Sequence, residues 1–324
     1  MGNGVLVSLC VITYNQETYI GEALESVLAQ DYDNLEIIIS DDNSSDSTFR
    51  IIEDICKSYK GNHSLVLNRN ERNLGVVGNL NKALQLSSGK YICLAAGDDV
   101  MYPDRISFSV REMTKLNVSS LTLNMRKIDE KSVPLNGYIN SSTEDRIEIY
   151  NIDNYLKKDY VSCGASRLID RKMIDVFGFI EDTCPTEDSV FNFRAFLLDG
   201  LAFSFRVSGD YRVHNASVSS AHSLLTRIDP ALIFRQYNKD LELAYAQKIV
   251  NRSAYKKLKK DIESYLVRET AIRKLYRKNG LAGRIITWIS LLPSFKIGWG
   301  SKKLLFSKLI QFSKLKQSKN GYRK

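Results

Sequence analysis

Two pairs of carboxylates in this 324-residue chain come directly after segments that have the pattern of β-strands. The pair Asp41–Asp42 follows the apolar run 35–39, and the pair Asp98–Asp99 follows the run 91–95, while Glu187–Asp188 lies far downstream. Carboxylates just beyond the carboxyl ends of strands lie where open α/β sheets bind their ligands. The spacing therefore predicts an enzyme with a site for a nucleotide, a divalent metal and a general base.

Each pair also has an ordinary structural interpretation. Asp41 can form an Asx turn or cap the helix that follows it. Asp98–Asp99 can belong to a surface turn before Pro103. Glu187–Asp188 precedes an apolar helical run, and acids are favourable in the first turn of a helix. The residues alone leave these alternatives open.

The elements that position these acids alternate along the first hundred residues. Apolar runs predict strands, and apolar residues at helical spacing predict helices between them. The expected strands are 5–13, 35–39, 65–67 and 91–95, and the expected helices are 20–30, 49–59 and 77–86. Such alternation implies right-handed crossovers and a mainly parallel sheet. We therefore expect an α/β fold.

The next hundred residues have a weaker pattern. Residues 103–116 predict a helix, residues 121–124 and 167–169 resemble strands, and the polar, turn-rich stretch 127–142 predicts a loop. No G-x-G-x-x-G follows the first strand and no G-x-x-x-x-G-K-[ST] occurs, which argues against a dinucleotide-binding dehydrogenase and a P-loop NTPase. The five cysteines lack C-x-x-C spacing, which indicates buried thiols in a reducing compartment. No basic leader precedes the first strand, so a secretory signal is not expected.

The net charge of +9 is unevenly distributed. Residues 1–250 carry a net charge of −8 and residues 251–324 a net charge of +17, which predicts an anionic partner for the tail. The apolar stretch 284–299 is too short and interrupted for a membrane span. Residues 302–316 have the basic, amphipathic pattern of a helix on an anionic bilayer. The alternative is a helix packed on the body with a solvated basic face, and no nucleic-acid motif accompanies the charge.

A series of ordered motifs resembles those of family 2 glycosyltransferases, which have the GT-A fold. The motifs are residues 7–15, 24–30, 36–46, 73–75, 88–92, 97–99, 185–188 and 211–217. The resemblance covers about residues 5–220 and does not extend to the tail. It departs from the pattern at Ala96, which stands where the first Asp of the D-x-D motif often lies. The implied fold is a Rossmann-like, mainly parallel sheet flanked by helices, with a helical, basic C-terminal extension.

The resemblance also implies roles for the nucleotide-binding and catalytic residues. Asp41 becomes the acceptor for a pyrimidine N–H, and residues Thr13, Tyr14 and Asn15 line the base and ribose pocket. Asp188 becomes the general base that takes the proton of the acceptor hydroxyl in an inverting transfer. A single catalytic carboxylate is then sufficient.

A metal site follows from the same resemblance. Asp98 is the best candidate ligand for Mg²⁺ or Mn²⁺, with Asp99 adjacent and His214 as a further contact. Arg212 is assigned to nucleotide binding, at the diphosphate leaving group. From the residues alone, a solitary His is more often a packing or surface residue, so that interpretation stays open for His214.

Taken together, the sequence predicts a catalytic domain over residues 1–222, with a nucleotide-sugar half at about 1–100 and an acceptor half at about 101–222. Residues 223–324 are expected to form a helical, basic region that meets a membrane. The predicted enzyme is cytoplasmic and peripheral at the inner face of the cell membrane. It moves a hexosyl or N-acetylhexosaminyl group from a nucleotide-diphosphate sugar, most simply a UDP-sugar, to a carbohydrate or lipid-linked acceptor in surface polysaccharide or glycolipid assembly.

Two other functions were weighed. Enzymes that activate sugars by nucleotidyl transfer need a Gly-rich, basic loop after the first strand, and residues 13–17 do not supply one. A catalytically silent binding protein that acts through the basic tail is the alternative from another class, and Ala96 leaves room for it.

Overall fold

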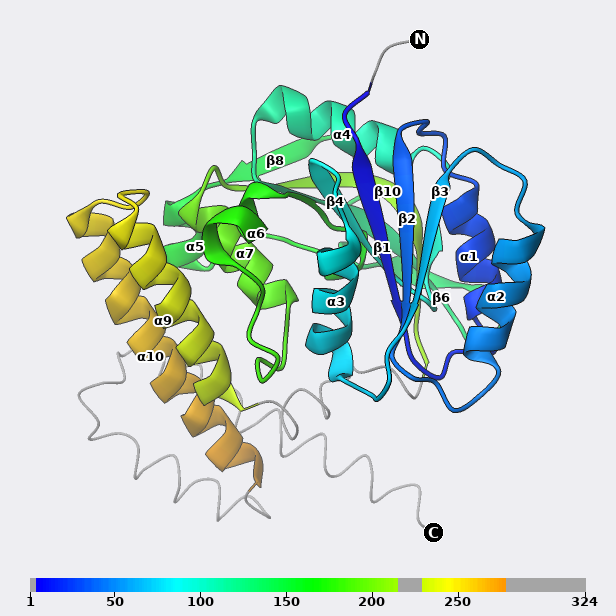
Figure 1. Ribbon diagram of the computed structural model, residues 1–324. Helices are drawn as coiled ribbons and strands as arrows, with labels where there is room; N and C mark the ends of the chain where they lie inside the picture. The colour runs from blue at the N-terminus through cyan, green and yellow to red at the C-terminus, as the bar shows by residue number, and fades with distance from the viewer. Residues whose placement is uncertain (1–3, 215–228, 278–324) are drawn as a thin grey trace. The chain divides into compact units, whose positions relative to one another are not determined.

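The computed structural model describes residues 4–214 and 229–277 (Figure 1). The described residues separate into two compact units. One comprises residues 4–214 with 242–250, and the other comprises residues 229–241 with 251–277. All the predicted site residues lie in the first unit.

Ten strands of the described chain form one mixed sheet, in the order β3-β2-β1-β4-β9-β6-β10-β5, with β7 beside β6 and β8 beside β10. The strands are β1 (Val7–Thr13), β2 (Leu35–Asp41), β3 (Ser64–Arg69), β4 (Tyr91–Ala96), β5 (Val100–Met101), β6 (Ser120–Ile128), β7 (Pro134–Tyr138), β8 (Ile147–Tyr150), β9 (Leu168–Asp170) and β10 (Leu201–Arg212). This arrangement confirms the predicted α/β fold class.

The first half of the sheet is parallel, as the alternating pattern predicts. Strands β3, β2, β1 and β4 are parallel neighbours. Thr13 lies opposite Asp41, which lies opposite Arg69, and Ile12 lies opposite Ala96. The carboxyl ends of four strands therefore meet at one edge, which brings the first two acidic pairs into the same region.

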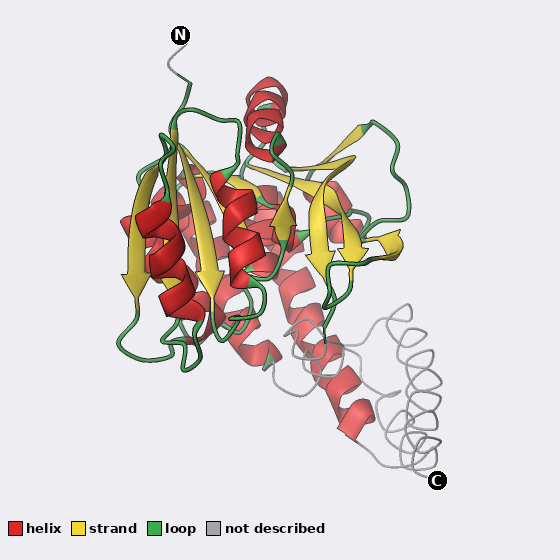
Figure 2. Ribbon diagram, turned by 90° about the vertical axis from the view of Figure 1, so that its right-hand side faces the viewer, coloured by secondary structure: helices red, strands yellow, loops and turns green. Residues whose placement is uncertain are grey.

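Helices cover this half of the sheet through their apolar faces (Figures 1 and 2). They are α1 (Ile20–Leu28), α2 (Thr48–Ser58) and α3 (Gly75–Leu86). In α1 the buried residues are Ile20, Ala23, Leu24 and Val27, which recur at the helical spacing that predicted the element. Each crossover from one parallel strand to the next thus uses one helix.

Strand β9 separates the parallel half from the second half of the sheet, because it runs antiparallel to both β4 and β6. Beyond it, β10 is parallel to β6 and antiparallel to β5. The helices of this half are α4 (Arg105–Leu116), α5 (Ile152–Lys157), α6 (Lys172–Phe177) and α7 (Asp188–Leu197), with a short 3₁₀ turn, η1 (Gly164–Ser166).

The predicted loop at residues 127–142 is wrong in part. Strand β6 continues to Ile128 and β7 pairs with it over residues 134–138. Most of β7 is exposed, so its residues lack the apolar alternation that reveals a half-buried strand. A polar edge strand of this kind has no clear hydrophobic signal.

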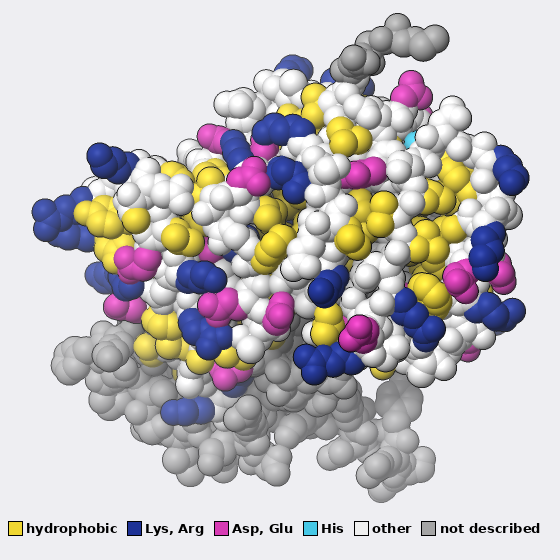
Figure 3. Space-filling model, viewed as in Figure 1, with side chains coloured by type: hydrophobic (Ala, Val, Ile, Leu, Met, Phe, Trp, Pro, Cys, Tyr) yellow, Lys and Arg dark blue, Asp and Glu magenta, His cyan; other side chains and the backbone are white. Residues whose placement is uncertain are grey.

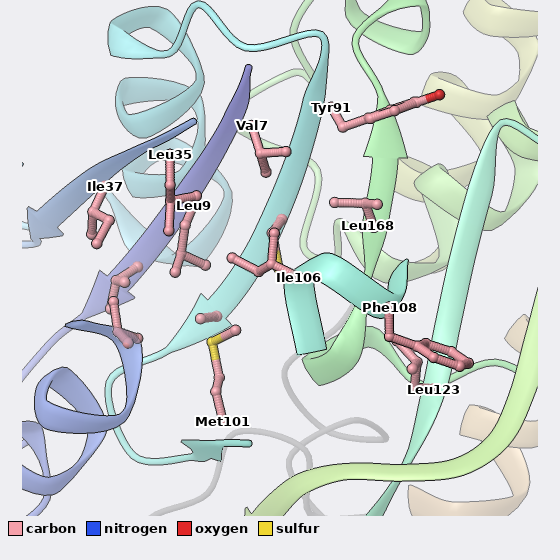
Figure 4. Close-up of a cluster of buried hydrophobic side chains, with 14 of the residues drawn as sticks. Val7, Leu9, Leu35, Ile37, Tyr91, Met101, Ile106, Phe108, Leu123 and Leu168 are labelled. Atoms are coloured by element: carbon pink, nitrogen blue, oxygen red, sulfur yellow. The ribbon is translucent and has the colours of Figure 1, made fainter. Parts of the chain in front are cut away.

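One large hydrophobic cluster of the first unit lies against one face of the sheet, where alternate residues of the strands point inward. Val7 and Leu9 of β1 pack there with Leu35 and Ile37 of β2 (Figure 4). Further along the same cluster are Tyr91, Met101, Ile106, Phe108, Leu123 and Leu168. This continuous core extends from the parallel half into the mixed half, so both halves of the sheet hold the site at its edge.

The second unit consists of helical segments. They are residues 230–241 of helix α9 (Pro230–Ala246) and helix α10 (Arg252–Arg277), which lie in the predicted helical region 223–324. The rings of Tyr237 and Tyr265 lie 5.9 Å apart. Among the described residues, no helix combines the length and the apolar composition needed to cross a membrane. The predicted amphipathic segment 302–316 lies outside the described residues.

Charge is mixed over the visible surface of the described residues. On the face in Figure 3, basic and acidic side chains are interspersed with hydrophobic ones and do not gather into one patch.

Candidate functional site

The loop after β1 is fastened to the turn after β2. Asn15 adopts a left-handed backbone conformation with φ of 50°, and its N–H donates to Ser44 Oγ at 2.9 Å. The Asn15 side-chain oxygen in turn accepts from the Ser45 N–H at 2.8 Å. Tyr14, between Thr13 and Asn15, is 46% exposed. These bonds leave the Tyr14 ring on the surface of the loop, where a ligand can reach it.

Gly97 brings the second acidic turn against this loop. Thr13 Oγ1 donates to Gln16 Oε1 at 2.7 Å, and a Cβ at Gly97 would lie 2.7 Å from Thr13 Oγ1. The Gly97 N–H also donates to the carbonyl oxygen of Ile12 at 3.0 Å. Glycine is required by this close approach, which places Asp98 beside the predicted nucleotide loop.

Asp41 is fully buried beneath its own turn. Its carboxylate accepts from both the N–H and the hydroxyl of Ser44, and Arg69 Nε lies 3.6 Å from it. Both oxygens are thus engaged within the turn. The assignment of Asp41 to a pyrimidine base stays a prediction.

Asp42 binds the beginning of α3. One carboxylate oxygen accepts from the Leu74 N–H at 2.8 Å and from Asn70 Nδ2 at 2.9 Å, and the other accepts from the Gly75 N–H at 2.8 Å. A carboxylate satisfies the unpaired N–H groups and the positive dipole end of a helix N-terminus. Asp42 therefore has the structural role that helix capping predicts.

The second acidic turn is joined to the end of β10. Asp98 Oδ2 lies 2.9 Å from His214 Nε2, and the Arg212 N–H donates to Asp99 Oδ1 at 2.9 Å. Arg212 Nε also donates to the carbonyl oxygen of Asp98 at 2.8 Å. The structure thus brings together four residues that the sequence predicted from segments more than a hundred positions apart.

The Arg212 side chain is almost completely buried and bonded to protein groups. Its terminal nitrogens donate to Glu22, to the carbonyl oxygen of Asp129 and to Ser132 Oγ. The guanidinium also lies over the ring of Tyr19, with 4.9 Å between them. This arrangement holds the turn after β6 against α1, while the predicted contact of Arg212 with a leaving group stays a prediction.

Asp98 and His214 offer a carboxylate oxygen and an imidazole nitrogen to one point, which suits a divalent cation. Within the described residues, no group of three His, Cys, Asp or Glu side chains could hold a metal ion. Mg²⁺ is commonly held by one or two protein groups together with substrate phosphates. The pair therefore fits a metal that a diphosphate helps to bind.

Asp99 differs from Asp98 in its surroundings. Burial and the neighbouring Asp98 carboxylate raise the pKa of Asp99 to about 8, although the Arg212 N–H opposes this shift. Its carboxyl is directed to the backbone of β10. Asp99 thus links the turn to the strand, and its assignment as a metal ligand stays a prediction.

Asp188 is the first residue of α7, and its side chain is 51% exposed. A Cβ added to Gly164 of η1 would overlap all three atoms of the Asp188 carboxylate, so the carboxylate packs directly on the glycine. Burial and the Asp188 charge raise the pKa of the neighbouring Glu187 to about 7. The predicted base is accordingly accessible at one side and closely packed at the other.

Two buried arginines, Arg105 and Arg167, were missed in the sequence. Arg105 Nη2 donates to the carbonyl oxygens of Leu94 in β4 and Ala165 in η1, at 2.9 and 2.8 Å, and so ties the strand before Asp98 to the turn that supports Asp188. Arg167 Nη2 lies 3.8 Å from Asp188 Oδ1. The only signals in the sequence were a charged residue near the start of the predicted helix 103–116, for Arg105, and one at the start of the strand-like run 167–169, for Arg167.

Cys163 is a buried thiol directly before η1. Burial raises the pKa of its thiol, the Asp188 and Asp99 carboxylates raise it further, and the Arg105 charge opposes them. Cys163 is thus within electrostatic reach of both the base and the second acidic turn. The arrangement can bind a metal–diphosphate group at Asp98 and accept a proton at Asp188.

Comparison with known proteins agrees with this geometry. Residues 8–178, more than half of the chain, match the family model "Glycosyl transferase family 2". An uncharacterized glycosyltransferase of Haemophilus influenzae is 39% identical over 115 residues, which are 36% of this chain and 35% of that protein. The Escherichia coli protein WfgD, named UDP-Glc:alpha-D-GlcNAc-diphosphoundecaprenol beta-1,3-glucosyltransferase, is 30% identical over 175 residues, which are 54% of this chain and 64% of WfgD. The match thus spans between about a third and two thirds of these relatives.

Solved structures resemble the fold over nearly the whole chain. S. aureus TarS 1–349 in complex with UDP-GlcNAc has a TM-score of 0.61 at 15% identity and covers 95% of this chain and 89% of that one. The mannosyltransferase PcManGT of Pyrobaculum calidifontis, solved with GDP-Man and Mn2+, has a TM-score of 0.54 at 14% identity and covers 96% and 86%. These likenesses confirm the predicted GT-A fold.

Proposed function

The chain belongs to glycosyl transferase family 2 and is a glycosyltransferase, and from this premise we propose that it transfers a sugar from a UDP-sugar to an acceptor hydroxyl with inversion. The observation that carries the proposal is that Arg105 bonds to both β4 and η1. Strand β4 leads to the Asp98–His214 pair, and η1 supports the Asp188 carboxylate. This link supports the proposal, because it joins the strand that leads to the candidate diphosphate-binding pair to the turn that supports the half-exposed candidate base.

Asp188 acts as the general base. The acceptor oxygen forms a bond to the anomeric carbon as the bond from that carbon to the UDP oxygen breaks, and the hydroxyl proton passes to Asp188. Attack from the face opposite the leaving group inverts the configuration at the anomeric carbon. One carboxylate is enough for this reaction, whereas glycoside hydrolases generally use two.

Asp98 and His214 would hold Mg²⁺ or Mn²⁺. When bound, such a cation neutralises the charge that develops on the departing diphosphate. The residues of this chain place the pair beside the β1 loop, because Gly97 packs against Thr13. We assign Thr13, Tyr14, Asn15 and Asp41 to the nucleotide side of the site, and Arg212 to the support of the diphosphate side.

The choice of UDP is supported by two relatives. TarS 1–349 binds UDP and UDP-GlcNAc, and the name of WfgD specifies a UDP-glucose donor and a diphosphoundecaprenol-linked acceptor. We therefore propose a hexosyl or N-acetylhexosaminyl donor and a lipid-linked or carbohydrate acceptor in surface polysaccharide or glycolipid assembly. PcManGT binds GDP-Man, which makes GDP-sugars the appropriate control.

The acceptor also suggests a location. We propose that residues 1–222 form the catalytic domain and that the basic region 223–324 brings it to the anionic inner face of the cell membrane. The net charge of +17 over residues 251–324 supports this assignment, because basic segments are attracted to anionic lipids.

A nucleotide-release assay tests the proposed function. Purified protein with Mn²⁺ is incubated with UDP-glucose, UDP-galactose, UDP-GlcNAc and GDP-mannose, each with undecaprenyl-diphosphate-GlcNAc and without acceptor. We expect acceptor-dependent release of UDP from at least one UDP-sugar and none of GDP. Release of GDP alone would show that the donor is a GDP-sugar. Release of neither nucleotide would contradict both the proposed donor and the proposed acceptor.

A further inference from the structure

Arg167 is completely buried yet incompletely bonded. Its side chain is 0% exposed, and Nη1 donates to Ser120 Oγ at 3.2 Å. Nε and Nη2 have no hydrogen-bond partner among the described residues. These two nitrogens form one edge of the guanidinium, which is the edge that binds a carboxylate with two parallel hydrogen bonds. A buried polar group of this kind needs an explanation in a folded protein.

The acid beside this edge is Asp188. Its Oδ1 lies 3.8 Å from Arg167 Nη2, which is an ion-pair distance but too long for a hydrogen bond. Gly164 packs against the other side of the same carboxylate. The Asp188 carboxylate therefore lies between Gly164, where any larger side chain would overlap it, and the Arg167 guanidinium, which has two unpaired N–H groups.

Other charged and titratable groups surround the pair. Burial lowers the pKa of Arg167, and the nearby groups Asp188, Cys163, Glu187 and Tyr160 oppose this shift. Asp99 and Arg105 affect the pKa of Cys163 in turn. Only Asp188 among them has a recorded ion-pair contact with Arg167 in the described chain. The surroundings thus assign the unpaired edge to Asp188.

We propose that Arg167 is a positioning residue for the catalytic base: it binds the Asp188 carboxylate through its Nε and Nη2 edge and holds that carboxylate directed at the acceptor hydroxyl. This inference rests on the proposed function, because it takes Asp188 as the base. Arg167 has no exposed surface and does not touch the substrate. An arginine keeps its proton throughout, so it can stabilise the carboxylate without competing for the proton that is transferred.

The buried arginines differ in what lies beside their unpaired nitrogens. Arg212 uses three nitrogens in bonds to the protein. Arg105 donates from Nη2 to two carbonyl oxygens, and its Nε and Nη1 have no hydrogen-bond partner among the described residues. The Arg167 side chain donates one hydrogen bond within the described chain, to Ser120 Oγ, and its unpaired Nη2 has the Asp188 carboxylate at ion-pair distance. The carboxylate beside the open edge, and not the open edge alone, therefore points to a role for Arg167.

A double-mutant cycle in thermal unfolding tests the pairing without any substrate. Arg167→Met, Asp188→Asn and the double variant are compared at pH 8 by their Tm shifts. We expect the double variant to lose at least 3 °C less than the sum of the single losses, because each single change leaves an unpaired partner. The matched control is Arg194→Met, which removes a buried arginine of the same helix α7 and should combine additively with Asp188→Asn. Additive shifts for Arg167 would overturn the proposal.

Kinetics with the active UDP-sugar separate positioning from simple structural support. For Arg167→Met we expect kcat to fall at least tenfold at pH 6, with KM for the donor and the Kd for UDP within twofold of wild type. The loss should appear in kcat alone, because a base that is displaced from the acceptor hydroxyl slows the chemical step and leaves donor binding intact. Arg167→Lys should restore part of kcat, since it returns the charge without the two-pronged edge.

The outcomes distinguish the two proposals. An unchanged kcat in Arg167→Met would overturn the positioning role even if the Tm shifts are coupled. If wild type transfers sugar from no donor, the proposed function fails, and the Tm cycle still decides whether Arg167 and Asp188 are paired. Coupled Tm shifts together with a loss in kcat at unchanged KM and Kd would support the positioning role.

Discussion

The two acidic regions at the sheet edge contain the same residue types but differ in how completely they are bonded. After β2, Asp42 accepts from three N–H groups, and both oxygens of Asp41 are engaged by Ser44. Around Asp188 the carboxylate is half exposed, and the nearby Arg167 has two unpaired nitrogens. A carboxylate whose hydrogen bonds are all made within the protein holds the backbone in place. A group that keeps unpaired donors or acceptors is available to bind a ligand or to transfer a proton. The raised pKa of Glu187 marks the second region in the same way.

The largest effect is expected for the base. Asp188→Asn should lower kcat by about 10²- to 10⁴-fold, which is the usual contribution of a general base. The Tm should fall by only a few degrees, because the side chain is half exposed and caps no helix through its carboxylate, although the buried Arg167 loses its partner. Steady-state UDP release, compared with the exposed control Asp54→Asn on α2, measures the effect. Full activity in Asp188→Asn would show that Asp188 is not the general base, and the two acidic regions would then not differ in function.

The opposite result is expected at Asp42. Asp42→Ala leaves three N–H donors without their acceptor in a buried place, so the free energy of unfolding should fall by about 3 kcal/mol. Urea unfolding measures this loss, and Asp42→Asn should recover part of it. If Asp42→Ala keeps wild-type stability but loses UDP binding, then Asp42 is a ligand group and the comparison is wrong.

A smaller change at Gly164 should act on activity alone. In Gly164→Ala the new Cβ must displace the Asp188 carboxylate, which can move toward solvent, so we expect a loss of about 10- to 100-fold in kcat with the fold retained. The control is Gly21→Ala in α1, where a Cβ meets nothing within 4 Å. Wild-type kcat in Gly164→Ala would show that the position of the carboxylate is not critical.

The smallest effect concerns pH and stability. The pKa of Glu187 is raised to about 7 in the folded protein, so the folded state favours the protonated acid. Its contribution to stability is fully present below the ordinary pKa of a glutamate and is lost as pH rises through about 7. Glu187→Gln should therefore reduce, by about 1 to 3 kcal/mol, the loss in free energy of unfolding between pH 4.5 and 8. Urea titrations at both pH values measure it, and an unchanged slope would mean that Glu187 is ionised in the folded state.

The parallel half of the fold was readable in the sequence because its strands are buried on both faces. The predicted helix at 49–59 is α2, at Thr48–Ser58, and the predicted strand at 91–95 is β4, at Tyr91–Ala96. The mixed half was less readable. Strand β7 is polar and exposed, and β10 runs for twelve residues through a segment in which only its last two residues, Tyr211 and Arg212, belonged to a motif.

The site divides in the same manner. Residue type and order located Asp98, Asp188 and His214, and the structure brings Asp98 to His214. Arg105 and Arg167 could not be found, because arginine is normally a surface residue and its burial depends on contacts between distant segments. Likewise, the sequence does not show which N–H groups donate to the carboxylates of Asp41 and Asp42. Those donors come from the Ser44 turn and from the start of α3.

Calorimetric titration of UDP tests the central claim most directly, with and without Mn²⁺, on wild type, Asp98→Asn and the distant control Asp54→Asn, with GDP as the second nucleotide. We expect Mn²⁺-dependent binding of UDP to wild type and to Asp54→Asn, and its loss in Asp98→Asn with the Tm retained. UDP binding that is equal in all three proteins, or that ignores Mn²⁺, would contradict the assignment of the Asp98–His214 pair to a metal–diphosphate site.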